Sequence, residues 1–158
     1  MFTGIVQDQV TIQHIQTTPT GLTIAFSLPK WGSPQIGESI LLHGICSTVT
    51  TVSDDHFTVD YIVETIRVTT VSDWIVGQTI HAEPAATLMT KLSGSLVTGH
   101  VDQAAIITAI DPLTIQLSDD LIVYMFSKGS VTINGVNLTI IECSTNTIIV
   151  KLIPQTLK

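Results

Sequence analysis

Apolar and polar residues alternate along several short stretches of the chain, a pattern typical of β-strands with one buried face. The alternation is clearest over residues 9–15, 22–28 and 56–62. Thr, Ile and Val dominate these stretches, and their branched side chains suit a pleated sheet. Turn-forming sequences separate them at Thr20-Gly21, 34–37, 53–55, Asp111-Pro112 and Asn134-Gly135. Short strands at this spacing predict a small all-β barrel or sandwich.

Two stretches carry weaker helical signals. Residues 63–74 place apolar side chains at Ile66 and Trp74, a modest helical spacing. Residues 85–92 follow Pro84 and end just before Gly94, and proline at the start and glycine beyond the end are typical of a helix. We expect this second stretch to be a helical connector between domains.

An internal repeat of about ninety residues organises the chain. Residues 3–9 resemble 98–104, and residues 43–49 resemble 134–140. The register continues with Val59 against Val150. Chance similarity between strands rich in the same few residues is the alternative, but the turn glycines match in order. The repeat predicts two similar β-domains, at residues 1–97 and 98–158.

The second copy of the repeat is shorter than the first. Lys158 aligns with Arg67, so residues 68–97, which include the strand-like run 79–83, have no counterpart. A barrel without its last strand has edges with unpaired backbone groups. A naturally short chain, a truncated product, and an edge strand supplied by another chain all account for this.

Composition excludes several classes of function. Hydrophobic residues make up 44% of the 158 residues and charged residues only 12%, which excludes a disordered chain. Six Lys and Arg residues stand against thirteen Asp and Glu residues, giving a net charge of −7. Binding to nucleic acid or to an anionic membrane requires a basic face that six scattered cations do not supply.

The chain start and the cysteines bear on location and metal binding. Residues 1–6 carry neither a basic segment nor a long apolar one, so we expect no signal peptide and a cytoplasmic location. Cys46 and Cys143 are expected to be thiols rather than a disulfide. Neither lies in a Cys-x-x-Cys or Cys/His ligand pattern, so we predict no metal site.

Several motifs, in order along nearly the whole chain, resemble those of riboflavin synthase (α-chain type) and the related lumazine-binding fluorescent proteins. The motifs are Met1-Phe2-Thr3-Gly4-Ile5-Val6, Gly37-Glu38-Ser39, Gly44-Ile45-Cys46-Ser47-Thr48-Val49, Phe57-Thr58-Val59-Asp60, Glu64-Thr65, Gly99-His100-Val101-Asp102, Lys128-Gly129-Ser130, Gly135-Val136-Asn137-Leu138-Thr139 and Leu152-Ile153-Pro154-Gln155-Thr156.

The resemblance implies an all-β fold of two tandem Greek-key barrels, the second lacking its last strand and a C-terminal helix. It also implies a homotrimer, one bound lumazine per barrel, and lumazine synthase as a candidate partner. The implied reaction is a dismutation, in which one 6,7-dimethyl-8-ribityllumazine gives four carbon atoms to a second. The products are riboflavin and a pyrimidinedione, and no cofactor is used. The alternatives are a non-catalytic lumazine- or flavin-binding protein, and an interaction module whose ligand site has decayed.

The same resemblance implies which residues contact the substrate, a flat heterocycle with a polar ribityl tail. Gly4, Ile5 and Val6 are expected along the ring in the first barrel. The other expected contacts are Cys46, Ser47, Thr48, Asp60, Tyr61, Ile62, Val63, Glu64, Thr65, Gly99, His100, Val101, Lys128, Asn137, Leu138, Thr139, Ile153, Pro154, Gln155 and Thr156.

Three of these positions are candidate catalytic residues. His100 is the candidate proton carrier, because histidine titrates near neutral pH. Ser39 and Cys46 could position or activate a nucleophile. The structural alternatives are a non-catalytic histidine at a strand start and a buried cysteine that only packs. For Lys128 the alternative is a surface cation, and for Asn137 a solvent-facing polar residue.

The chain departs from the family pattern at a few positions. His43 stands where Asn is usual, Ser47 where Leu is usual, and Asn137 where Ser is usual. Ser95 and His81 replace a His and an Asn. These changes largely keep the polar capacity of each position. The shorter second unit is a larger departure, because the family places a proposed catalytic aspartate and the trimer helix there.

Overall fold

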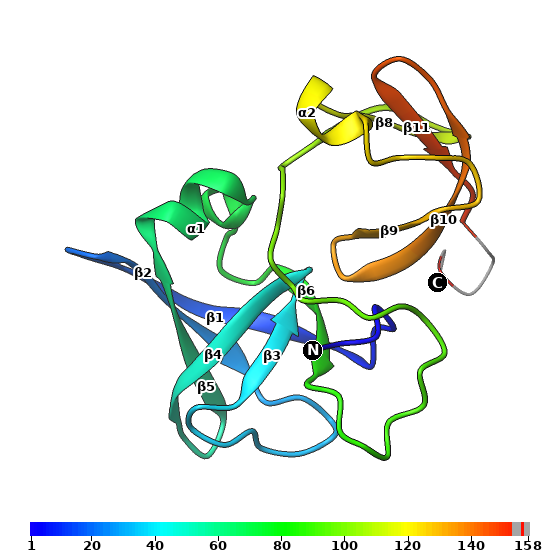
Figure 1. The fold of residues 1–158 in the computed structure, drawn as a ribbon. Helices are drawn as coiled ribbons and strands as arrows, with labels where there is room; N and C mark the ends of the chain where they lie inside the picture. Colours follow the sequence, from blue (N-terminus) through cyan, green and yellow to red (C-terminus); the bar gives the residue numbers. More distant parts are fainter. Residues whose placement is uncertain (153–155, 157–158) are drawn as a thin grey trace.

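The computed structural model describes residues 1–152 and residue 156. Six strands form a first unit: β1 (Asp8–Thr18), β2 (Gly21–Ser27), β3 (Ser39–Leu42), β4 (Ile45–Val52), β5 (His56–Ile62) and β6 (Thr79–Pro84). They close into an antiparallel barrel in the order β1-β2-β5-β4-β3-β6 (Figure 1). The alternating stretches predicted as strands fall on β1, β2 and β5, as expected.

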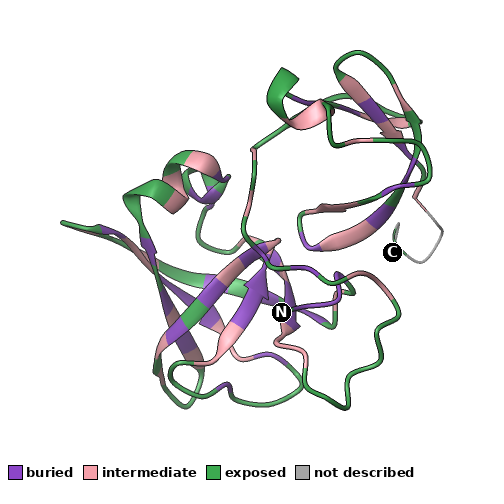
Figure 2. Ribbon diagram, viewed as in Figure 1, coloured by how far each residue is buried: buried purple, intermediate pink, exposed green. Residues whose placement is uncertain are grey.

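The interior of this barrel is filled by the apolar side chains of the alternating pattern. Phe26 and Phe57, paired across β2 and β5, stack with ring centroids 5.5 Å apart. Trp74 lies edge-on to Phe26, with a centroid distance of 6.2 Å. Aromatic pairs of this kind add about 0.5–1.5 kcal/mol beyond the burial of their area. Buried residues are accordingly concentrated in the barrel in Figure 2.

The two helix predictions had different outcomes. Residues 63–74 form α1 (Val63–Val68) and the 3-10 helix η1 (Val71–Asp73). The helix predicted at 85–92 was wrong, because that stretch is a loop. Its start is held by the N-terminus, since the Ala86 N–H donates to the Met1 carbonyl at 2.8 Å. The Thr87 N–H then donates to the Thr90 hydroxyl at 2.9 Å, which closes a local turn instead of a helical one.

The second unit repeats this strand order without closing. Its elements are β7 (Ile106–Ile110), β8 (Leu113–Gln116), α2 (Asp119–Ile122), β9 (Ser130–Ile133), β10 (Val136–Cys143) and β11 (Thr147–Val150). The sheet order is β7-β8-β11-β10-β9. In residues 1–152 and 156 no strand corresponds to β6, so β7 and β9 are sheet edges. The prediction of an all-β fold is confirmed, with a closed first barrel and a second unit that is a five-stranded sheet in the described residues.

The two units meet at a pair of corresponding turns. The β3–β4 turn is His43–Gly44, and the β9–β10 turn is Asn134–Gly135. All four residues have positive φ, as two-residue hairpin turns of this type require. A Cβ atom built on Gly44 would lie 2.8 Å from the backbone nitrogen of Gly135. The two turns are therefore in direct backbone contact.

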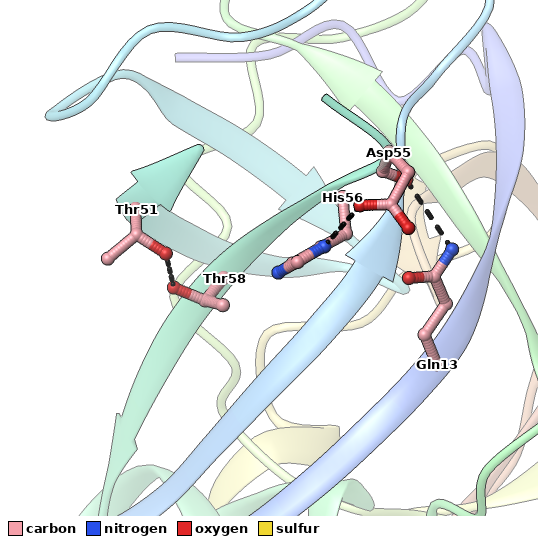
Figure 3. A network of polar contacts seen from close by, with 5 residues as sticks. All are labelled: Gln13, Thr51, Asp55, His56 and Thr58. Atoms are coloured by element: carbon pink, nitrogen blue, oxygen red, sulfur yellow. Dashed lines mark hydrogen bonds and ion pairs between the residues drawn. The ribbon is translucent and has the colours of Figure 1, made fainter. Parts of the chain in front are cut away.

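Polar side chains stabilise the β4–β5 hairpin at the end of β4 remote from Cys46 (Figure 3). The hydroxyls of Thr51 and Thr58 lie 2.7 Å apart, and His56 Nδ1 lies 2.7 Å from a carboxylate oxygen of Asp55. The Gln13 side-chain amide donates to the Asp55 carbonyl at 3.4 Å. These contacts lie on the surface, where polar pairs contribute about 1 kcal/mol or less, so we assign this hairpin a structural role.

Candidate functional site

The candidate site segments of the two units are exchanged. The Cys46 N–H on β4 donates to the Gly99 carbonyl at 2.8 Å, so the segment 98–101 from the second repeat lies on the first barrel. In the same way, the Asn137 N–H on β10 donates to the Gly4 carbonyl at 2.8 Å. Gly4 corresponds to Gly99 in the repeat, and Asn137 corresponds to Cys46. Each repeat therefore contributes its Thr-Gly segment to the other unit.

This exchange corrects the expected position of the N-terminal motif. Gly4, Ile5 and Val6 were expected along the first barrel, but Gly4 lies against the second unit. The repeat identifies equivalent positions, but it does not reveal which copy of a segment packs on which unit. Only the long-range hydrogen bonds settle that.

The glycines at these crossings cannot be replaced without movement. Gly4 has a φ of +72°, and a Cβ atom there would lie 2.7 Å from the Asn137 Cβ. Gly99 has a φ of +78°, and its Cβ would lie 2.8 Å from the Cys46 Cβ. Positive φ and close backbone approach both favour glycine. The repeated Thr-Gly pair thus marks the two places where the chain crosses between units.

The outer face of the first barrel is one candidate ligand wall. Cys46 is half-buried and Thr48 is exposed, at alternate outward positions of β4. Ser39 pairs with Thr48 across β3 and β4 and is half-buried. His100, directly after the crossing at Gly99, is exposed, whereas Val101 packs on the barrel core. The structure thus brings the three candidate catalytic residues to the same region of the first barrel.

The corner between β5 and α1 extends this region. Ile62 and Val63 are exposed, with 60% and 64% of their surface accessible. Thr65 is half-buried, and the Glu64 carboxylate is paired with Arg67, whose NH2 nitrogen lies 2.6 Å away. That hydrogen bond lowers the pKa of Glu64 despite the opposing effect of desolvation. Asp60 points instead towards β2, where the Thr23 hydroxyl donates to it at 2.6 Å.

Two residues expected to contact the substrate lie inside the barrel. Ser47 and Tyr61 are buried, with their hydroxyl oxygens 2.8 Å apart, and Ser47 also donates to the Ile45 carbonyl. Burial raises the pKa of Tyr61, partly offset by the hydrogen bond with Ser47. Adjacent residues of a strand point to opposite faces. Placing Cys46 and Thr48 outside therefore turns Ser47 inside, and these two predictions are corrected.

The second candidate wall lies on the second unit. Asn137 is half-buried, and its side-chain oxygen accepts a hydrogen bond from the Ser95 hydroxyl at 2.8 Å. Thr139 and Lys128 are exposed, and Leu138 points into the core of the second unit. Thr156 is exposed in a turn, and the predicted contacts Ile153, Pro154 and Gln155 lie outside the described residues.

A cavity of about 550 Å³ opens between the units. One side is the apolar inner face of the second sheet, including Ile115 and Ile148. The other side is the segment 96–105 and the first-unit turn at His43. The cavity is bordered by residues of both edge strands, β7 and β9. It therefore lies where β6 lies in the first barrel.

His43 at this boundary has an unusual environment. Its Nδ1 atom is buried without a hydrogen-bond partner, and its ring lies 5.3 Å from that of His81. Burial, together with repulsion from His81, lowers the pKa of His43 from 6.5 to about 4. His81 Nδ1 in turn lies 3.3 Å from the Asn134 carbonyl of the second unit.

Sequence reasoning did not identify Glu83, whose side chain holds the N-terminal segment in place. It is 4% exposed, and its carboxylate accepts three hydrogen bonds from Thr3 and Gly4. Strand alternation places it on the outer face of β6, opposite to Ile80 and Ala82. No signal in the sequence shows that the N-terminal segment covers that face.

Metal and membrane features were also searched in the described residues. Within residues 1–152 and 156, no three His, Cys, Asp or Glu side chains are grouped so as to hold a metal ion. Over the same residues, no helix has the length and apolar character needed to cross a bilayer. Both cysteines are free and half-buried.

Comparisons with known proteins also divide the chain into two copies of one domain. The family model "Lumazine binding domain" matches residues 3–85 and 98–158. The riboflavin synthase of Bacillus amyloliquefaciens is 37% identical over 164 residues, covering 99% of this chain and 76% of that protein. The riboflavin synthase of Escherichia coli (strain K12) is 32% identical over 167 residues, covering 100% and 78%.

The solved structures of LumP are also similar. LumP complexed with riboflavin superposes with a TM-score of 0.82 at 27% identity, covering 94% of this chain and 85% of that one. LumP complexed with 6,7-dimethyl-8-(1'-D-ribityl) lumazine gives a TM-score of 0.80, with coverage of 94% and 84%.

Proposed function

Because this chain belongs to the lumazine-binding domain family, we propose that it is a riboflavin synthase. Its substrate is 6,7-dimethyl-8-ribityllumazine, used both as donor and as acceptor of a four-carbon unit. One molecule leaves as riboflavin and the other as a pyrimidinedione. The two substrate molecules supply every atom of the two products, so the reaction needs no external oxidant or reductant.

The observation that carries the proposal is the crossed contact between Gly99 and Cys46. It brings His100 to the wall that holds Cys46 and Ser39. The corresponding crossing at Gly4 brings Ile5 to the wall that holds Asn137. One unit therefore offers an imidazole and a thiol, and the other offers an aliphatic side chain and an amide.

In the proposed mechanism, a proton leaves the 7-methyl group of one lumazine and the resulting anion is delocalised over the ring. His100 carries that proton, because its exposed imidazole nitrogen can accept a proton and release it again. Cys46 and Ser39 position or activate the group that adds to the second lumazine. Holding two rings face to face replaces a bimolecular encounter by a local one.

The proposed binding residues follow the two walls. On the first unit they are Cys46, Thr48, Asp60, Ile62, Val63, Glu64, Thr65, Gly99, His100 and Val101. On the second wall they are Gly4, Ile5, Val6, Lys128, Asn137 and Thr139, with Leu138 supporting the wall from the core. Ile153, Pro154, Gln155 and Thr156 stay predicted contacts that only the resemblance implies. Ser47 and Tyr61 support the first wall from inside the barrel.

The test is a turnover assay. Purified chain is mixed with 6,7-dimethyl-8-ribityllumazine, and riboflavin formation is followed by absorbance. Formation that is proportional to protein concentration and absent from a heat-denatured control supports the enzyme. Tight binding of the lumazine without riboflavin formation contradicts catalysis.

A second candidate function is non-catalytic binding of a lumazine or flavin. The similarity to LumP, whose structures hold riboflavin and a lumazine, favours it. Bound pigment without turnover is the result that this candidate expects, and absence of any binding contradicts both candidates.

The assembly and location also remain predictions. A homotrimer would pair the first unit of one chain with the second unit of its neighbour, and lumazine synthase is a candidate partner as the source of the substrate. A cytoplasmic location is expected for the same metabolism. Native mass spectrometry, alone and with lumazine synthase added, measures the first two.

A further inference from the structure

The N-terminal segment is held by one buried carboxylate. The Glu83 Oε1 atom accepts hydrogen bonds from the Thr3 N–H at 2.6 Å and from the Thr3 hydroxyl at 2.7 Å. Its Oε2 atom accepts a hydrogen bond from the Gly4 N–H at 3.0 Å. Hydrogen bonds to an ionised acceptor are the stronger kind and fix geometry as well as energy. Glu83 therefore determines where Thr3 and Gly4 lie.

Gly4 links Glu83 to the second unit through its two backbone groups. Its N–H is bound by Glu83, and its carbonyl accepts the hydrogen bond from the Asn137 N–H. The Asn137 side chain is fixed from the same segment, because Ser95 donates to its oxygen while the Ser95 N–H donates to the Thr3 carbonyl at 2.9 Å. A closed chain of contacts thus runs from β6 of the first barrel to β10 of the second unit.

We propose that Glu83 is a positioning residue for the ligand site of the other unit. It holds the Gly4 carbonyl on the Asn137 N–H, and so fixes where Ile5 and Val6 lie beside the second ligand wall. This inference rests on the proposed function, because it assigns Glu83 to the second ligand wall defined there. A hollow of about 410 Å³, lined by Thr3, Ile5 and Gln7 together with Glu83, borders the same segment.

The first wall depends on Glu83 less directly. The Glu83 carboxylate bonds Thr3 and Gly4, and the Gly99 segment is linked to them only through the backbone pair of Phe2 with Val97. Loss of the Glu83 carboxylate is therefore expected to weaken the second-unit site selectively. General destabilisation would affect both sites.

The main test is the Glu83→Gln variant of the full chain, titrated with riboflavin and followed by quenching of flavin fluorescence. Glutamine keeps the shape, but it places an NH₂ group against one of the N–H donors. We expect affinity at one of two sites to fall about tenfold or more, with the other site changed by less than about twofold. Glu142→Gln is the matched control, because Glu142 is an exposed carboxylate on β10, and it should leave both affinities unchanged.

Double variants identify the affected site. In an Asn137→Ala background, Glu83→Gln should cause little further loss. In a Thr48→Ala background it should keep its full effect. Equal losses in both backgrounds would show a merely structural role and overturn the inference. Amide hydrogen exchange gives a readout without ligand: the peptide containing residues 1–7 should exchange faster in Glu83→Gln, and the peptide covering β4, whose Cys46 N–H binds the Gly99 carbonyl, should not.

The titrations also distinguish failure of this inference from failure of the proposed function. If wild-type chain binds neither riboflavin nor 6,7-dimethyl-8-ribityllumazine, the proposed function and this inference both fail. If it binds two molecules and Glu83→Gln binds them equally well, only this inference fails. If Glu83→Gln does not fold, Thr3→Val removes just the hydroxyl contact and should weaken the second-unit site about threefold. Unchanged affinity in Thr3→Val then overturns it.

Discussion

The two units follow one strand pattern, and within the part of the chain that the structure describes only the first closes into a barrel. β6 pairs with β1 on one side and with β3 on the other, so a single strand seals the first unit. In the second unit the corresponding edges are β7 and β9, and all five residues of β7 are exposed. The comparison teaches that in the first unit one strand, β6, joins the two ends of the sheet.

The interiors differ as a consequence. The first barrel is filled by aromatic and branched side chains, with Phe26 and Phe57 fully buried. The second unit instead faces a cavity of about 550 Å³ along Ile115 and Ile148. Side chains that line this cavity have protein neighbours on fewer sides than those inside the closed barrel, so they make fewer dispersion contacts.

The largest expected effect is on the rate of riboflavin formation, because only the first wall carries the imidazole of His100. His100→Gln should reduce riboflavin formation by about 10²- to 10⁴-fold while changing lumazine affinity by less than about threefold, because a general acid–base group acts in the transition state. Stopped-flow turnover and equilibrium titration measure the two quantities. His14→Gln on the exposed face of β1 is the control. Unchanged turnover in His100→Gln would remove His100 from the catalytic role.

A smaller effect compares the two cores directly. Ile24 and Ile115 are buried isoleucines on β2 and β8, and only Ile115 lines the cavity. Ile24→Ala should lower the free energy of unfolding by about 3–4 kcal/mol, and Ile115→Ala by about 1–2 kcal/mol. Urea denaturation followed by circular dichroism tests this. Equal losses would show that the second core is packed as tightly as the first.

The next prediction addresses the crossing between the units. Gly99→Ala should cost about 2–3 kcal/mol, because the added Cβ meets Cys46 at a positive φ. Gly77→Ala is the matched control: Gly77 has a φ of +87°, but nothing lies within 4 Å of the added atom, so about 1 kcal/mol is expected. Thermal unfolding of both variants distinguishes contact from backbone strain. If the two variants lose the same stability, the contact contributes nothing.

The smallest effect is a pH dependence at the boundary between the units. Burial and the neighbouring His81 lower the pKa of His43 to about 4, below its unfolded value of 6.5. The unfolded chain therefore binds a proton before the folded chain does, and stability falls as the pH decreases from about 6.5 towards 4.

We expect that loss to be roughly 1 kcal/mol, well below the full value of the shift, because the ring is partly open to solvent. His43→Asn places at this turn the residue that the second unit carries at Asn134, with nearly the same φ. The urea midpoint of the variant should depend less on pH between 4 and 6.5 than that of the wild-type chain. An unaltered slope would contradict this assignment.

Much of the fold could be predicted from local pattern. The alternation on β1, β2 and β5 is set by residues within each strand, and the Asn134-Gly135 turn follows from its own backbone preference. The helix expected at 85–92 failed because the competing contacts come from Met1, eighty-five residues away from Ala86. Local signals do not contain such a contact.

The candidate site could be predicted less completely, for the same reason. The residues Cys46, His100 and Asn137 stand in motifs, so the resemblance identified them. The exchange of Gly4 and Gly99 between units depends on how the two repeats dock, and the role of Glu83 depends on that exchange. Ser47 and Tyr61 could have been excluded from the wall by strand alternation, because they occupy inward positions with Ile45 and Val59.

The contact between Gly44 and Gly135 limits how the two repeats can diverge. A Cβ atom on Gly44 would lie 2.8 Å from the other backbone, and one on Gly135 would lie 3.1 Å from it. A mutation in either turn must therefore be compatible with the opposite half of the molecule as well as with its own hairpin. The two turns are far apart in the sequence, but at this contact neither can change without regard to the other.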